Sequence, residues 1–201
     1  MEEDIRTSDL RLEESGDLEM NNIIKIAVLG KALVGKTALI YRYLNDQIPT
    51  RETTVEDQYK KKLKINDNEF ELDILDTAGQ DDYQTMLEDW IEFASYFLLV
   101  YSIEDKESFE QVQKNYEKIV NKKGKNFYGV VIVGNKCDLE ENRQIKKEDV
   151  EEYANKIKVG NIETSALNNI NVNEAFLALV QIYIDKNIDD KKKKKCGCPC
   201  F

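Results

Sequence analysis

The amino-acid sequence predicts an α/β fold, in which a mostly parallel sheet of six strands has one antiparallel edge strand and carries helices on both faces. Runs with strand character alternate with segments of helical spacing, and this alternation favours parallel strands joined by helices. Residues 96–101 and 130–133 are continuously apolar, which is typical of strands covered on both faces. The runs 60–65 and 70–75 are joined by the polar turn 66–68, which predicts a hairpin and hence the antiparallel edge.

The remaining elements follow in chain order. The run 23–29 is rich in β-formers, ends at Gly30 and predicts a buried strand, and the short apolar stretch 159–162 is the sixth candidate. Helical spacing is present after Lys36 and over about 105–121. Two further helices carry apolar residues on one face, namely Val150, Ala154 and Ile157 in the first and Val172, Phe176, Leu179 and Tyr183 in the second.

The chain divides into an arm, one domain and a tail. A length of 201 residues suits a single domain with a substantial core, which we place at 23–184. Residues 1–22 contain eight carboxylates and two arginines, and such a segment cannot bury enough apolar surface to order itself. We expect a disordered, solvated arm; a partner-binding arm is the alternative. Residues 185–201 form a lysine-rich tail.

The composition excludes several kinds of chemistry. The chain has no histidine, so Ser-His-Asp catalysis, Cys-His catalysis and histidine-containing metal sites are excluded. A net charge of −10 argues against nucleic acid as a partner. Three of the four cysteines crowd the last six residues, which is no disulfide framework, and a four-cysteine zinc site would need Cys137 to reach them. We expect no signal peptide and no membrane span, because the longest apolar stretch, 93–101, is about half a span.

A phosphate-binding loop is predicted at residues 30–37, which match G-x-x-x-x-G-K-[ST] between a strand and a helix. The glycines let backbone N–H groups surround phosphate oxygens, and the helix N-terminus adds partial positive charge. Lys36 is expected to reach the β- and γ-phosphates, and the Thr37 hydroxyl to bind Mg²⁺. The alternative is a glycine turn with an N-capping threonine. This motif narrows the fold class to the P-loop NTPase fold.

Asp76, Gly79 and Gln80 follow the strand 70–75 in the order D-x-x-G-Q. A carboxylate at the carboxyl end of a strand beside a phosphate loop can hold Mg²⁺ through water. The Gly79 N–H can approach a γ-phosphate, and the Gln80 amide can orient an attacking water although it is no strong base. D-x-x-G alone also occurs in ordinary turns, but after a phosphate loop it indicates a nucleotide site.

Two further segments predict a guanine pocket. Asp138, after the strand 130–133, can accept hydrogen bonds from both the ring N–H and the amino group of guanine, a donor pair that adenine lacks. Lys136 can lie along the base, and Asn135 can tie this loop to the phosphate loop. The backbone N–H groups of 163–166 can hold the guanine carbonyl oxygen. These features argue against a P-loop kinase or ATPase.

These motifs, in this order, resemble the Ras superfamily of small GTPases over about residues 23–183. The segments 54–59 and 81–83 resemble the effector segment and second switch of the Ras and Rap branch. The resemblance implies a monomeric GTP hydrolase that takes GTP and Mg²⁺ and acts as a GTP/GDP signalling switch. It also implies effectors, an exchange factor and a GTPase-activating protein as partners.

The resemblance assigns roles to individual residues. Nucleotide contacts are implied for Gly30, Ala32, Leu33, Val34, Gly35, Lys36, Thr37, Ala38, Thr54, Gly79, Asn135, Lys136, Asp138, Ser165, Ala166 and Leu167. Mg²⁺ ligands are implied at Thr37, Thr54 and Asp76, and catalytic roles at Lys36, Gly79 and Gln80. Effector binding by strand addition is implied for Thr54, Val55, Glu56, Asp57, Gln58 and Tyr59.

Several positions depart from the Ras pattern. Ala32 and Leu33 replace two glycines of the phosphate loop, Ile48 replaces the aromatic residue beside the guanine, and Leu167 replaces a lysine. The first switch is one residue shorter and lacks its usual tyrosine. The changes at Ala32 and Leu33 support a second hypothesis, a GTP-bound interaction module with very slow hydrolysis.

The C-terminal tail predicts a lipid anchor. The last four residues fit C-a-a-X with Cys198 as the prenylated residue, and the terminal Phe201 favours geranylgeranylation. The lysines 191–195 attract an anionic membrane surface, and Cys196 is a second candidate for lipidation. We therefore expect the protein at the cytoplasmic face of the plasma membrane; a solvated basic tail with incidental thiols is the alternative.

Overall fold

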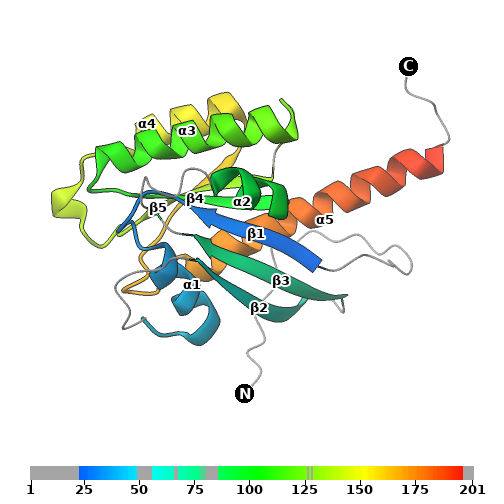
Figure 1. The fold of residues 1–201 in the computed structure, drawn as a ribbon, viewed down its shortest axis with the longest axis horizontal. Helices are drawn as coiled ribbons and strands as arrows, with labels where there is room; N and C mark the ends of the chain where they lie inside the picture. The colour runs from blue at the N-terminus through cyan, green and yellow to red at the C-terminus, as the bar shows by residue number, and fades with distance from the viewer. Residues whose placement is uncertain are drawn as a thin grey trace.

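The computed structural model contains a six-stranded mixed sheet with helices on both faces (Figure 1). It describes residues 23–48, 56–65, 68–77, 79, 86–125, 127 and 129–196, with backbone alone for 56 and 189–196. The strands are β1 (Ile23–Leu29), β2 (Glu56–Ile65), β3 (Asn68–Thr77), β4 (Tyr96–Ser102), β5 (Val130–Asn135) and β6 (Gly160–Glu163). The helices are α1 (Lys36–Asn45), α2 (Leu87–Phe93), α3 (Lys106–Lys123), the 3₁₀ turn η2 (Glu140–Asn142), α4 (Lys147–Ile157) and α5 (Val172–Cys196).

The strand order is β2-β3-β1-β4-β5-β6, and the β2–β3 pair alone is antiparallel. The predicted fold class, with its hairpin at one edge, is confirmed. β2 begins at Glu56, four residues before the predicted run. The prediction missed this start because Asp57 and Gln58 are polar, and an edge strand need not carry an apolar pattern. The short helix α2 was not predicted.

The alternation of side chains along the strands divides the core into two layers. In β1, Ile24, Ile26 and Val28 face α1 and α5, whereas Ala27 and Leu29 face α2, α3 and α4. This period of two is the expected geometry of an extended strand. Both faces of the sheet are therefore covered, and β4 and β5 are buried along their whole length, as their continuously apolar sequences predict.

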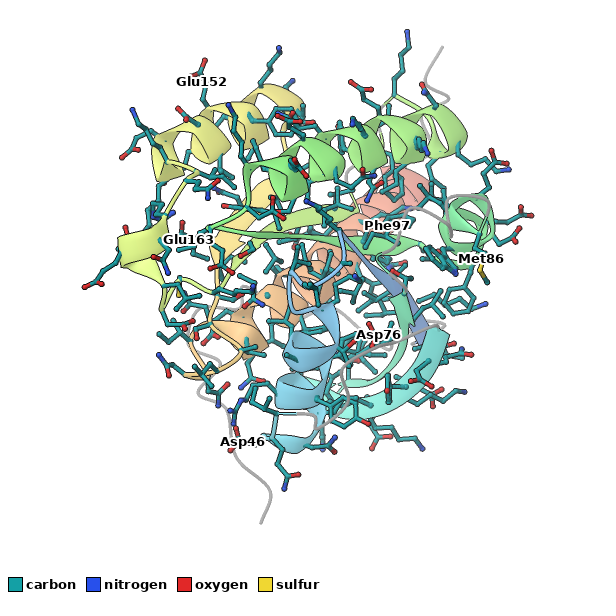
Figure 2. All side chains as sticks on the ribbon, turned by 60° about the vertical axis from the view of Figure 1, so that its left-hand side comes forward. Asp46, Asp76, Met86, Phe97, Glu152 and Glu163 are labelled. Atoms are coloured by element: carbon teal, nitrogen blue, oxygen red, sulfur yellow. The ribbon has the colours of Figure 1, made fainter. Side chains whose placement is uncertain are left out.

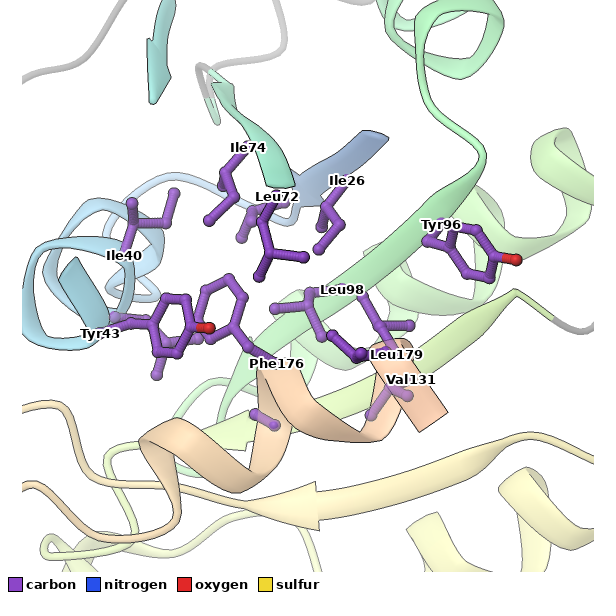
Figure 3. Close-up of a cluster of buried hydrophobic side chains, with 14 of the residues drawn as sticks. Ile26, Ile40, Tyr43, Leu72, Ile74, Tyr96, Leu98, Val131, Phe176 and Leu179 are labelled. Atoms are coloured by element: carbon purple, nitrogen blue, oxygen red, sulfur yellow. The ribbon is translucent and has the colours of Figure 1, made fainter. Parts of the chain in front are cut away.

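The layer between the sheet, α1 and α5 has an aromatic centre. The rings of Tyr43 on α1 and Phe176 on α5 stack with their centroids 4.0 Å apart, beneath Leu72 and Leu98 of the sheet (Figure 3). α5 continues beyond the core to Cys196, through the lysine run of the tail. Within the described ranges, no helix combines the length and apolar character that crossing a membrane requires.

Replacing Phe176 by alanine is expected to destabilise the fold by about 3–5 kcal/mol, because the ring is fully buried and its removal leaves a cavity. Denaturant unfolding of the nucleotide-loaded protein measures this loss. Ile23→Ala is the control, since this side chain is 47% exposed, and we expect it to cost less than about 1 kcal/mol. Equal losses for the two variants would contradict the assignment of Phe176 to the core.

Candidate functional site

The predicted phosphate, magnesium and base loops lie at one edge of the sheet. They follow the carboxyl ends of β1, β3, β5 and β6, which are parallel and therefore end at the same side. Figure 2 turns this edge toward the reader, with Asp76 near the middle and Glu163 to the left. The sheet topology thus brings together segments that are more than a hundred residues apart in sequence.

The phosphate loop has the tight backbone that its glycines predict. Gly35 precedes α1 with a φ of 93°, and a Cβ there would meet the side-chain nitrogen of Asn135. A Cβ at Gly30 would meet the carbonyl oxygen of Val100 in β4. Leu33 adopts a φ of 66°, which is unusual for a side chain other than glycine, and is 83% exposed. The two motif glycines are therefore required by close contacts, whereas Leu33 occupies a position that would suit glycine.

Lys36 lies buried beneath this loop. Its ammonium donates to the carbonyl oxygens of Gly30 at 3.0 Å and Lys31 at 3.1 Å. Burial lowers the pKa of Lys36 to about 8, and the nearby Asp76 carboxylate opposes this shift. A Cβ on Gly79 would meet both the Lys36 ammonium and the backbone nitrogen of Ala32. The D-x-x-G segment and the phosphate loop are thus in direct contact, as their pairing in sequence predicts.

The two described candidates for Mg²⁺ ligands are adjacent. The Thr37 hydroxyl donates to Asp76 Oδ2 at 2.7 Å, and Asp76 is fully buried at the end of β3. A hydroxyl and a carboxylate are hard oxygen donors, and Mg²⁺ at phosphate sites takes one or two such protein groups plus phosphate oxygens and water. The donor set therefore fits Mg²⁺. The third candidate, Thr54, lies outside the described residues.

Asn135 connects the phosphate loop to the loop after β6. Its side-chain nitrogen donates to the Val34 carbonyl at 2.9 Å, and its oxygen accepts from Thr164 Oγ1 at 3.1 Å and from the Ala166 backbone at 3.2 Å. The predicted tie between Asn135 and the phosphate loop is confirmed. Ser165 Oγ accepts from the Asn168 backbone at 3.0 Å, which closes the turn that follows.

The residues predicted to hold the base surround this connection. Lys136 has a φ of 65°, and its ammonium pairs with Glu104 Oε1 at 2.5 Å. Asp138 is half-buried in the same loop. Ile48 and Leu167, which replace an aromatic residue and a lysine, are 39% and 64% exposed. Sequence patterns did not identify Glu104, whose only signal is its position just beyond the carboxyl end of β4.

Arg42 is a second residue that sequence reasoning missed. From α1 it donates to the carbonyl oxygens of Ala166 at 2.8 Å, Leu167 at 3.0 Å and Asp46 at 2.7 Å. Asp46 in turn accepts from Asn169 at 2.9 Å. One guanidinium thus holds the loop after β6 against the end of α1, directly behind the backbone that was predicted to contact guanine.

Other predicted residues are only partly described. Val55, Gln80 and Cys198 lie outside the described residues, as does the segment 81–83. Residues 56–59 of the effector segment form the start of β2, at the edge of the sheet. Gln58 there donates to Asp73 Oδ1 at 2.6 Å.

Comparison with known proteins identifies the class to which this fold and site belong. A phosphate loop after β1, an aspartate at the end of β3 and an asparagine-linked loop after β5 are the arrangement of a P-loop nucleotide-binding protein. The sequence model of the Ras family matches residues 25–185. The chain belongs to the Ras family, whose members are GTPases that act as signalling switches.

Three curated relatives agree with this assignment. Ras-like protein 1 of Saccharomyces cerevisiae is 40% identical over 162 residues, covering 80% of this chain and 52% of the relative. Ras-like protein rasB of Dictyostelium discoideum is 36% identical over 185 residues, covering 90% and 93%. Ras-like protein RAS2 of Hydra vulgaris is 34% identical over 191 residues, covering 93% and 98%. The chain thus spans about half of the yeast relative and nearly all of the other two.

Arg42→Ala is expected to speed GDP dissociation about tenfold or more, because losing three hydrogen bonds from a charged donor frees the loop behind the base. Release of a fluorescent GDP analogue measures this rate. Lys61→Ala is the matched control, since Lys61 of β2 donates to the carbonyl oxygen of Tyr43 in α1 at 2.6 Å, away from the loop after β6. Unchanged release from Arg42→Ala, or equal acceleration in the control, would contradict the role of Arg42.

Proposed function

We propose that this chain is a membrane-anchored GTP/GDP switch that binds GTP with Mg²⁺, hydrolyses it to GDP, and binds effectors through residues 54–59. The observation that carries the nucleotide part is the side chain of Asn135, which links the phosphate loop to the loop of the proposed guanine contacts. This contact supports the proposal because it ties the phosphate loop to the loop after β6.

In this proposal the chain's own groups bind and orient the nucleotide. Lys36 donates to the β- and γ-phosphates, whose negative charge raises the pKa that burial lowers to about 8 and so favours the charged ammonium. The Gly79 N–H donates to the γ-phosphate, and Gln80 orients the attacking water. Thr37, Thr54 and Asp76 hold Mg²⁺, directly or through water. Mg²⁺ held there would offset the charge that develops on the phosphate oxygens.

The base is held from three sides. Asp138 accepts from guanine, Lys136 lies along the ring, and the backbone at Ser165, Ala166 and Leu167 borders the guanine oxygen, which competes with Asn135 Oδ1 for the Ala166 N–H. The pair between Lys136 and Glu104 limits the positions that the lysine stem can take. Remaining contacts come from Val34, Gly35 and Ala38 around the phosphates.

Membrane attachment is proposed to come from the tail. One lipid chain binds membranes only marginally, so stable attachment needs a second signal. Prenylation of Cys198 provides the first, and the lysines 191–195, with Cys196 as a further lipidation site, provide the second. In this proposal 1–22 is a disordered acidic arm, 23–184 is the G domain and 185–201 is the anchor at the cytoplasmic face of the plasma membrane.

The proposed partners follow from the edge strand and the switch cycle. β2 ends the described sheet, so an effector strand can add to it beside Asp57, Gln58 and Tyr59. An exchange factor and a GTPase-activating protein complete the cycle of a monomeric switch, and no nucleic acid takes part.

Very slow hydrolysis is a second candidate function, favoured by one observation at the phosphate loop. Ala32 lies directly against Gly79, and the Leu33 side chain stands in the solvent beside it. In Ras complexes an arginine from the activating protein passes close to this position and contributes about 10³ to 10⁵ in rate. Side chains here displace that arginine, and even about 1 Å of displacement can remove much of such an effect.

Asp138→Asn is expected to lose guanine selectivity and to favour xanthine, whose ring offers a matching acceptor. Competition between GTP and xanthosine triphosphate for the purified protein measures this preference. Asp149→Asn, on the exposed side of α4, is the matched control and should keep the preference for GTP. Retained GTP preference in Asp138→Asn would rule out the base-reading role.

The Ala32→Gly, Leu33→Gly double variant is expected to respond to a Ras-type activating protein at least about tenfold more strongly than the native chain, because the path of the arginine is open. Single-turnover GTP hydrolysis, with and without the activating protein, measures both rates. The intrinsic rate is the internal control and should change less, since Lys36 and Gln80 remain. Full stimulation of the native chain, with no gain from the glycines, would refute the steric argument.

A further inference from the structure

A hollow lies at the amino ends of the parallel strands, at the opposite end of the sheet from the nucleotide site. It has a volume of about 340 Å³ and opens between the loop before β4, the α3–β5 connection and α5. Its apolar wall is formed by Tyr96 and Phe127. Three lysines, Lys123, Lys125 and Lys186, line it from different elements. The amino ends of β1, β4 and β5 meet here, as the hydrogen bond from the Ser95 N–H to the Lys25 carbonyl at 3.0 Å indicates.

The charged residues that line this hollow are all lysines, although the chain as a whole carries a net charge of −10. In the part of the chain that the structure describes, Lys123 and Lys125 form no ion pair. Burial lowers the pKa of Lys123, and the adjacent Lys122 acts in the same direction, while Glu92 opposes them. Glu92 itself lies 3.8 Å from Lys122, outside the hollow. The hollow therefore concentrates cationic groups without an acidic side chain among the residues that line it.

Compensation of the helix dipole explains only part of this cluster. Lys122 and Lys123 occupy the last turn of α3, where cations are favourable. Lys125 lies beyond the helix, after Gly124, and Lys186 comes from α5. Neither is needed to balance α3, yet both border the same hollow as Lys123. Three ammonium groups around one cavity are suited to a compact, multiply charged anion such as a phosphomonoester.

The position of the hollow relative to the C-terminus points to the source of that anion. Lys186 and Cys196 are ten positions apart in α5, a rise of about 15 Å along the helix. Figure 1 shows that α5 extends past the sheet on the same side as the end of α3. The hollow therefore lies on the side of the domain from which the end of α5 extends.

We propose that this hollow binds the phosphomonoester-bearing headgroup of an anionic membrane lipid, and so orients the domain on the membrane surface. The site adds a headgroup-selective contact to the tail, whose lysines recognise negative charge in general. The inference rests on the proposed membrane association but not on prenylation, and it is independent of GTP hydrolysis.

Vesicle binding by the full, unlipidated, GDP-loaded chain tests this proposal. The probes are phosphatidylcholine vesicles that contain phosphatidylinositol bisphosphate, or phosphatidylserine at matched total charge. We expect at least fivefold tighter binding to the bisphosphate vesicles. The variant K123Q/K125Q/K186Q should reduce this ratio to about one, while K62Q/K114Q/K156Q, which removes three exposed lysines elsewhere, should leave the ratio unchanged. Loss of the preference in the control, or its survival in the first variant, would overturn the proposal.

Two further arms separate the site from the tail and from soluble ligands. Replacing the lysines 191–195 by glutamine should weaken binding to both kinds of vesicle but keep the preference for the bisphosphate vesicles. Loss of that preference would assign the selectivity to the tail and overturn the proposal. Soluble inositol trisphosphate should bind at least tenfold more weakly than the bisphosphate vesicles, and equal affinity would make the ligand a soluble phosphate instead. The single variant K125Q changes an exposed residue and should leave GDP binding unchanged. We expect it to reduce the preference for the bisphosphate vesicles in part, and an unchanged ratio in this variant would count against the site.

Discussion

The geometry of the nucleotide site depends on one buried amide, the side chain of Asn135. Its nitrogen and oxygen bind the loop after β1 and the loop after β6, while its backbone carbonyl accepts from Ile103 at 3.1 Å after β4. Leaving one of these buried groups without its partner costs about 1–3 kcal/mol. The phosphate and base loops therefore cannot move independently. The same contact requires glycine at position 35, because a Cβ there would overlap the side-chain nitrogen of Asn135.

The sheet makes this connection possible by holding the loops on a rigid base. Gly30 packs against the Val100 carbonyl of the neighbouring strand β4. The first residue of the phosphate loop is therefore held in a fixed position relative to β4. Both faces of β4 and β5 are buried, which leaves these strands no freedom to shift their register. The rigid part of the site thus comes from the core, and the charged groups that bind ligands lie on the loops that it supports.

Those parts of the site that are local in sequence could be predicted, and those that depend on distant contacts could not. Residues 30–37, Asp76 and Asn135 occur in short patterns whose chemistry can be stated without a structure. Arg42 contacts carbonyl groups about 125 residues away and carries no pattern of its own. Glu104 is found only when β4 and β5 are paired, which places it beside Lys136. The edge strand β2 was predicted too short for a related reason, since its polar start is stabilised by pairing with β3 rather than by burial.

The parallel strands also separate two kinds of anion recognition. At their carboxyl ends lie the backbone N–H groups and Lys36 that are proposed to bind the nucleotide phosphates. At their amino ends, lysines from α3, the following loop and α5 surround a hollow with an apolar wall. Because the two sites lie at opposite ends of the same strands, a membrane held at the amino ends leaves the nucleotide edge accessible to regulators. The same arrangement keeps β2 exposed at the side of the sheet, where an added strand would run alongside β2 rather than against the lipid surface. The lysines of the hollow therefore do not compete with the nucleotide site, although phosphate binding is proposed for both.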